Sequence, residues 1–245
     1  MVAISAATAR ICVRRVRELT GSKLPVDVRS IACQMGVEIL EPADILVDGY
    51  VGSTPDGRRV IRYRRSNPYL RNRFTIAHEI CHLLIAEVSG TPLSSRKSRK
   101  GFDDEEVLAN RLAAEMLMPE SILRDELCQV VPCWGTLQKL RKLFDVSAHS
   151  LLRRTTEVSG VVAVFARRRS NHSPHVFYCD ATVCPPVYFS EPFQSSIARA
   201  ANSVRGPQFS VSATAADQNL EIPCELRIAA TSAAGEDWAF GWTNF

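Results

Sequence analysis

The sequence lacks any long hydrophobic segment. No run approaches the roughly 18 apolar residues that a membrane-spanning helix requires. The first residues are small and apolar, but Arg10, Arg14, Arg15 and Arg17 follow them too soon for the hydrophobic part of an export signal. We therefore expect a cytoplasmic protein with no membrane partner.

A disulfide framework is also missing. The eight cysteines are scattered along 245 residues, whereas disulfide-stapled domains are shorter and denser in cysteine. We interpret them as reduced thiols. Two Cys-x4-Cys pairs, Cys128/Cys133 and Cys179/Cys184, have a spacing open to metal or redox chemistry. Apolar side chains that happen to be close in sequence are the favoured interpretation.

A strong net charge is absent as well. The formal charge of +4 is too small to indicate nucleic-acid binding by itself, and 46% apolar with 23% charged residues is ordinary for a globular protein. From residue 160 to the end there are no lysines, six arginines and seven acidic residues. The basic excess therefore lies wholly in the preceding part of the chain.

Prolines, glycines and capping residues divide the chain into an α+β pattern. Asn67-Pro68 is a typical helix start, with a capping side chain before the proline of the first turn. Pro55-Asp56-Gly57 lies between two alternating runs and predicts a β-hairpin. Helices are predicted at about 1–20, 25–36, 67–87, 103–118, 119–127 and 137–157 (broken at 145–147), and strands at 37–40 and within 49–64. After residue 160, short β-rich runs at 161–166, 175–179, 209–213, 221–228 and 238–242 accompany an amphipathic helix near 194–204.

The motif His78-Glu79-Ile-Cys-His82 lies within the helix predicted at 67–87. Histidines four residues apart on a helix are about 40° apart around its axis and one turn apart along it, so both imidazoles can reach one ion. Glu79 is placed to contact a water on that ion and to accept its proton. The alternative is a helix whose histidines lie at the surface or make core hydrogen bonds. The apolar surroundings argue against it, because burying these polar groups without a shared partner is costly.

A catalytic zinc takes three protein ligands and keeps one position open. Candidates for the third ligand lie in the helix predicted at 103–118, where Glu106 is on the edge of the apolar face beside small residues. Glu105 and Asp104 are expected to point further towards solvent. Asn110, one turn after Glu106, is expected to hydrogen-bond a ligand imidazole. The alternative for Glu106 is a first-turn acid favoured by the helix dipole.

These residues lie in two strings that resemble the ImmA/IrrE family of bacterial metallopeptidases. The first, Arg-Phe-Thr-Ile-Ala-His-Glu-x-x-His-Leu-Leu, begins at Arg73. The second, Glu-x-x-Ala-Asn-x-x-Ala-Ala-Glu-x-Leu-Met-Pro, ends at Pro119. The resemblance covers the chain from Leu24 to Glu157. Within these strings it has two departures, since family members usually have Gly in place of Cys81 and Phe in place of Leu112.

The resemblance implies a zinc-dependent endopeptidase that cleaves a partner transcriptional repressor, in a stress response or in the control of mobile elements. The partner is expected to be a helix-turn-helix repressor. Carried over residue by residue, the Zn²⁺ ligands are His78, His82 and Glu106, and the catalytic base is Glu79.

The implied fold is α+β, with a zincin-like core in which a small sheet accompanies the His-Glu-x-x-His helix and the helix that carries the ligand glutamate. We predict a zincin-like metallopeptidase domain at residues 1–135, a helix-turn-helix-like segment at 136–159 and a small β-rich α+β module at 160–245. By analogy with some relatives, the last module is sensor-like.

Two other functions compete with the peptidase. The residue pattern around 138–155 is that of a helix-turn-helix, which is compatible with a DNA-binding regulator that has a vestigial metal site. A toxin–antitoxin partner that acts by binding alone is the other, and the intact Glu79 argues against it. Direct DNA binding is not favoured, because such helix pairs also serve as packing modules. The side chains that could read bases are Ser147, His149, Ser150, Arg153 and Arg154.

Overall fold

The structure is a computed structural model that describes residues 4–90, 104–128, 134–159, 163–169, 175–179, 209–214, 223–233 and 236–242. Contacts within the chain divide it into two compact units. Unit 1 comprises Met1–Pro119 and Lys142–Ser147, and unit 2 comprises Glu120–Arg141 and Ala148–Phe245. The three domains expected from the sequence, at 1–135, 136–159 and 160–245, remain a prediction.

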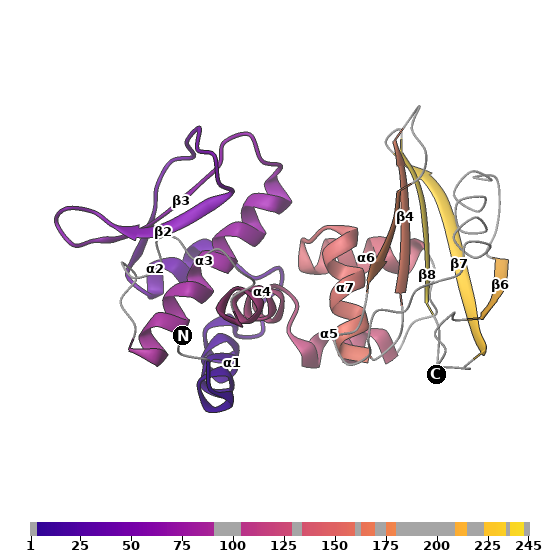
Figure 1. The fold of residues 1–245 in the computed structure, drawn as a ribbon, viewed down its shortest axis with the longest axis horizontal. Coiled ribbons are helices and arrows are strands. Elements are labelled where there is room, and N and C mark those ends of the chain that lie inside the picture. Colours follow the sequence, from indigo (N-terminus) through magenta and orange to yellow (C-terminus); the bar gives the residue numbers. More distant parts are fainter. Residues whose placement is uncertain are drawn as a thin grey trace. The chain divides into compact units, whose positions relative to one another are not determined.

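Unit 1 has an α+β architecture, as expected. Its three strands form one mixed sheet in the order β1-β3-β2, with β1 parallel and β2 antiparallel to β3. Helices α1, α3 and α4 pack on one another, and α3 also packs on β2 and β3 (Figure 1). The elements are α1 (Ala6–Thr20), α2 (Val28–Gln34), β1 (Val37–Ile39), β2 (Gly49–Ser53), β3 (Arg59–Tyr63), α3 (Tyr69–Ser89) and α4 (Asp104–Leu117).

The starts of α2 and α3 are determined by different interactions. Asp27 accepts hydrogen bonds from two amides in the first turn of α2, and Gly36 adopts a φ of +67° just beyond its end. The expectation that Asn67 caps α3 is wrong. Its amide group donates to Asp48 at 3.0 Å instead, and α3 begins without a side-chain cap. Asn67 therefore ties the start of α3 to the residue that precedes β2.

The predicted hairpin is confirmed as β2 and β3, and its register determines which backbone groups remain at the sheet edge. The amide of Arg64 donates to Asp48 at 2.8 Å, and the amide of Thr54 donates to Arg58 at 2.9 Å. Because bonded pairs alternate along antiparallel strands, every second residue of β2 has its amide and carbonyl groups on the side away from β3. These residues are Gly49, Val51 and Ser53.

Helix α3 forms the centre of the core of unit 1. Its apolar residues are buried around most of the helix, which agrees with the all-round apolar pattern of its sequence. Helix α4 covers it with a face that is likewise fully enclosed. The fully buried large side chains of the two helices are Ile80, Leu83, Leu84, Ile85, Leu112, Met116 and Leu117.

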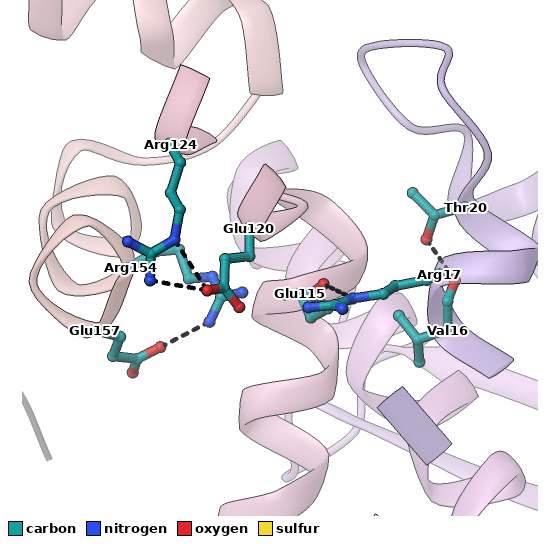
Figure 2. A network of polar contacts seen from close by, with 8 residues as sticks. All are labelled: Val16, Arg17, Thr20, Glu115, Glu120, Arg124, Arg154 and Glu157. Atoms are coloured by element: carbon teal, nitrogen blue, oxygen red, sulfur yellow. Dashed lines mark hydrogen bonds and ion pairs between the residues drawn. The ribbon is translucent and has the colours of Figure 1, made fainter. Parts of the chain in front are cut away.

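A half-buried ion pair joins α1 to α4. The Arg17 guanidinium donates to the Glu115 carboxylate at 2.6 Å, and the Glu115 side chain is almost completely enclosed (Figure 2). A buried carboxylate requires such a partner, since desolvation disfavours its charge. The contact connects α1 with the helix that carries Glu106.

In its described residues, unit 2 combines α5, α7 and most of α6, whose last turn belongs to unit 1, with an antiparallel sheet of five strands in the order β5-β4-β8-β7-β6. Helix α5 packs on α7. Ion pairs join Arg124 to Glu120 at 2.9 Å and Arg154 to Glu157 at 3.3 Å (Figure 2). The elements are α5 (Glu120–Cys128), α6 (Trp134–Phe144), α7 (Ala148–Ser159), β4 (Ala163–Arg169), β5 (His175–Cys179), β6 (Phe209–Thr214), β7 (Pro223–Ala233) and β8 (Glu236–Trp242).

The predicted helix pair and the β-rich runs after residue 160 are confirmed by α6, α7 and strands β4 to β8. The helix expected near 194–204 lies outside the described residues. So do Cys133 and Cys184, which leaves both Cys-x4-Cys pairs untested. Among the helices that the structure describes, none is long and apolar enough to cross a membrane.

Candidate metal centre

His78 and His82 lie one turn apart on α3 and direct the same ring atom to the same point. Their Nε2 atoms are 2.9 Å apart, and their rings meet edge to face with centroids 4.5 Å apart. Both side chains are mostly enclosed, at 15% and 10% exposure. Two lone pairs cannot face each other at this distance without a proton or a cation to share.

Glu106 reaches the same point from the first turn of α4. Its carboxylate oxygens lie 3.3 Å from Nε2 of His78 and 3.2 Å from Nε2 of His82. Hydrogen bonds from His78 and then His82 hold the pKa of Glu106 well below its usual range. The three side chains place one ligand atom each within 4.8 Å of one another. The structure thus brings together the three ligands expected from the sequence.

The expectation for Glu105 is wrong. Its side chain is 24% exposed, less than the 53% of Glu106, and its Oε1 lies 2.9 Å from Nδ1 of His82. The two successive glutamates of α4 therefore contact opposite edges of one imidazole ring. Burial lowers the pKa of His82, but the hydrogen bonds to Glu105 and Glu106 outweigh it and raise the pKa to about 9.

Asn110 lies on α4 one turn after Glu106, as expected, but not against a ligand imidazole. It is exposed on α4, and within the described part of the chain it makes no hydrogen bond with either imidazole. Glu105, and not Asn110, is the α4 residue that contacts Nδ1 of a ligand imidazole, that of His82. The Nδ1 atom of His78 is buried and has no hydrogen-bond partner among the described residues. The two histidines therefore differ in how they are held.

Glu79 lies beside the cluster without joining it. Its side chain is buried, and burial raises the pKa of its carboxyl group, against the opposing effect of the nearby His82 and His78. The backbone of Val51, on the outer edge of β2, lies close enough to Glu79 to lower the pKa of its carboxyl group. The carboxylate therefore lies enclosed next to the point on which the three ligands converge.

The two departures from the family pattern leave the cluster intact. Cys81 and Leu112 are both fully buried, and neither belongs to the group of converging ligand atoms. Burial raises the pKa of the Cys81 thiol far above its ordinary value. A protonated, enclosed thiol agrees with the interpretation of Cys81 as apolar packing.

The donor set fits a divalent cation. Two imidazole nitrogens and one carboxylate are the ligands that zinc and similar metals take in catalytic sites, where a further position stays open. The geometry also supplies a reason for burying them together. A cation at this point would be shared by both Nε2 atoms and the Glu106 carboxylate, which offsets the loss of hydration of all three groups.

Two curated relatives match part of the chain. It is 34% identical over 99 residues to the radiation response metalloprotease IrrE of Deinococcus radiodurans, covering 39% of this chain and 30% of that protein. The IrrE of Deinococcus deserti is 33% identical over 99 residues, covering 39% of this chain and 35% of that protein. The chain thus spans about a third of the length of the curated relatives that it matches.

A solved structure shares the fold more widely. The match to a Mycobacterium tuberculosis transcriptional regulator has a TM-score of 0.56 at 14% identity, covering 97% of this chain and 87% of that one. At this identity the likeness concerns the fold alone. In sequence, residues 33–156 match the IrrE N-terminal-like domain, which is a peptidase domain. Since this match includes 124 of the 245 residues, the chain belongs to the peptidase family of the IrrE N-terminal-like domain.

Proposed function

We propose that this protein is a zinc-dependent endopeptidase that cleaves a partner transcriptional repressor. The observation that carries the proposal is the convergence of His78, His82 and Glu106 within 4.8 Å, with the buried Glu79 beside them. A site that only stored a metal would not need a carboxylate that lies next to the ligands without binding the metal itself.

Zinc is the metal that this donor set supports best. His78 and His82 offer Nε2, and Glu106 offers a carboxylate oxygen, which is the two-histidine, one-glutamate set of zinc peptidases. When bound, zinc supplies Lewis acidity that lowers the pKa of water towards about 7 and polarises a carbonyl group. The protein contributes the fixed geometry of the three side chains and the proton transfer that follows.

Glu79 performs that proton transfer. Its carboxylate accepts the proton of the attacking water as the new carbon–oxygen bond forms, and it then donates this proton to the amide nitrogen as the carbon–nitrogen bond breaks. Burial raises the pKa of Glu79, which makes the carboxylate a stronger base than a solvated one. The Val51 backbone lies close to this carboxylate and lowers its pKa, against the larger effect of burial.

The outer edge of β2 supports a peptide as the substrate. The backbone groups of Gly49 and Ser53 face that edge, and those of Val51 on the same edge lie close to Glu79. In the described residues, no strand other than β3 pairs with β2. An extended peptide can add to such an edge as a further strand, which would bring its backbone alongside the catalytic base.

The partner and its setting are supported by the relatives. The matched Deinococcus proteins are radiation response metalloproteases, and the structure with a similar fold is a transcriptional regulator. A peptidase that cleaves a helix-turn-helix repressor in the cytoplasm, in a stress response or in mobile-element control, combines these two roles. The proposed function involves no membrane.

The two alternative functions, a DNA-binding regulator and a toxin–antitoxin partner that acts by binding alone, receive less support. Of the α7 residues that could read bases, Arg154 is buried, and both Arg153 and Arg154 contact Glu157 on the same helix. Residues that read bases must extend from the helix to the groove. The intact Glu79 also remains without a role in a toxin–antitoxin partner that acts by binding alone.

Substitution of Glu79 by Gln tests the proposal. Gln is nearly isosteric and does not remove a ligand, so the variant is expected to fold and to hold about one zinc per chain by metal analysis. It cannot accept a proton, and general bases contribute typically about 10²–10⁴-fold to rate. Cleavage of a co-expressed repressor is therefore expected to fall at least 100-fold, and the uncleaved repressor should be retained on the immobilised variant.

The matched control is Glu87→Gln on the same helix, where an exposed carboxylate contacts Arg59. It should cleave as the wild type does. Wild-type protein without bound zinc, or a Glu79→Gln variant that still cleaves at the wild-type rate, would contradict the proposal.

A further inference from the structure

We infer that Glu105 is a positioning residue for the metal site: its carboxylate holds the imidazole of His82 by Nδ1, so that Nε2 faces the metal position. The inference rests on the proposed zinc peptidase and deepens it. Glu105 is not one of the three converging ligands. It acts through the ring of His82.

The hydrogen-bond geometry determines which nitrogen carries the proton. An ionised carboxylate only accepts, so the 2.9 Å contact between Oε1 of Glu105 and Nδ1 of His82 requires a proton on Nδ1. In a neutral imidazole the remaining lone pair is then on Nε2. That atom is the one that lies 2.9 Å from Nε2 of His78 and 3.2 Å from Glu106. The ring is thus held at both edges.

The two histidines are not equivalent in this respect. Nδ1 of His78 is buried without a hydrogen-bond partner among the described residues. His82, in contrast, has a carboxylate partner that is itself mostly enclosed, at 24% exposure. Such partners fix the ring orientation and increase the basicity of the ligand nitrogen. The Glu105 contact therefore makes His82 the more rigid of the two histidine ligands.

The position of Glu105 on α4 also suits a negative charge. Asp104, Glu105 and Glu106 are all in the first turn of the helix, where the helix dipole favours anions. Of these three, only Glu105 contacts Nδ1 of a ligand histidine, while Asp104 is exposed. One turn of helix thus supplies a ligand and the group that orients another ligand.

Zinc affinity of the full-length protein, measured by competition with a chromogenic chelator, tests the inference. Glu105→Ala should bind zinc about 10–100-fold more weakly than the wild type, because the orienting partner is lost. Glu105→Gln keeps an acceptor oxygen without the charge, so its loss should be smaller. Asp104→Ala removes an equal charge from the same turn and should stay within about twofold of the wild type, since no imidazole depends on it.

Nitrogen-15 NMR of the histidine rings in the zinc-loaded protein gives a readout that a general loss of stability does not move. His82 should bind zinc through Nε2 and show a slowly exchanging proton on Nδ1. That proton should exchange rapidly with water in Glu105→Ala and remain protected in Glu105→Gln. If the Ala variant fails to fold, the reduced affinity of the Gln variant carries the test.

The outcomes separate this inference from the proposed function. Wild-type protein that binds no zinc would overturn both. Zinc binding with unchanged affinity and an unchanged Nδ1 proton in Glu105→Ala would overturn the role of Glu105 alone. Coordination of His82 through Nδ1 would do the same.

Discussion

Gly49 lies where the first residue of β2 meets α3, and space explains why no side chain is present. A Cβ atom on Gly49 would lie 2.4 Å from Cγ2 of Thr75 and 3.1 Å from the carbonyl oxygen of Arg62. The first contact is with a buried, β-branched side chain, and the second is with the backbone of β3. Neither neighbour can move far. The absence of a side chain therefore allows the sheet to approach the helix that carries His78 and Glu79.

Gly49→Ala is expected to lower the free energy of unfolding by about 1–3 kcal/mol through overpacking, as measured by chemical denaturation. Gly52→Ala on the same strand is the control, because its Cβ would meet only the Tyr50 ring at 3.9 Å, and it should change stability little. Adding Thr75→Ser, which removes Cγ2, should recover part of the loss. An equal effect of both alanine variants would contradict the steric explanation.

The residues of the site differ in how far the sequence predicts them. His78, Glu79 and His82 follow from helical spacing, because three positions on one helix have a fixed relation. Glu105 does not follow, because adjacent residues on a helix point about 100° apart. Periodicity therefore assigned only Glu106 to the site. The orientation of α4 lets both glutamates reach one ring from opposite edges, and nothing local encodes that orientation.

The first turns of α3 hold the segment Lys142–Ser147 within unit 1. The buried Arg73 guanidinium donates to the carbonyl oxygens of Val26 at 2.6 Å, Asp145 at 3.1 Å and Phe144 at 3.4 Å. It also lies 3.4 Å from the Asp145 carboxylate, which accepts a hydrogen bond from Tyr69. A planar guanidinium can serve these acceptors at once, which an ammonium group cannot. The buried charge thus has a complete set of partners.

Arg73→Met is expected to destabilise unit 1 by about 3–5 kcal/mol, since it leaves buried acceptors without a donor. Arg73→Lys should recover only part of this loss. The control is Arg71→Met two residues earlier, where an exposed side chain contacts Asp48 and a surface pair contributes about 0–1 kcal/mol. Thermal unfolding followed by circular dichroism measures all three. Similar losses for Arg71→Met and Arg73→Met would contradict the role of Arg73 as the buried donor to these carbonyl groups.

Helices, strands and the β2–β3 hairpin were predictable because their signals are local, whereas the pairing of β1 with β3 was not. Asp27, Gly36 and Pro119 mark element boundaries through their own backbone or side-chain chemistry. The parallel contact between β1 and β3 joins segments that are separated by the whole of β2, and no local pattern reports it. Asn67 shows the same limit, because a suitable capping residue was engaged by Asp48 from a distant part of the chain.

At the scale of the whole molecule, the candidate metal site belongs to unit 1 alone. His78, His82 and Glu106 come from α3 and α4, and both helices lie within Met1–Pro119. The five-stranded sheet belongs to unit 2. A ligand that binds only the folded form of one unit stabilises that unit by mass action. Zinc is therefore expected to protect α3 and α4 directly.

Hydrogen exchange with and without a chelator measures this effect segment by segment. At free zinc about 100 times its dissociation constant, the stabilisation is about 2.7 kcal/mol, which slows exchange through global opening of unit 1 by about 100-fold. Amides of α3 and α4 should lose this protection when zinc is removed, with β7 and β8 as the internal reference. In His82→Ala the chelator should have little effect on α3 or α4, because the site has lost a ligand. Chelation that leaves exchange in α3 and α4 of the wild type unchanged would mean that no metal is bound between these helices.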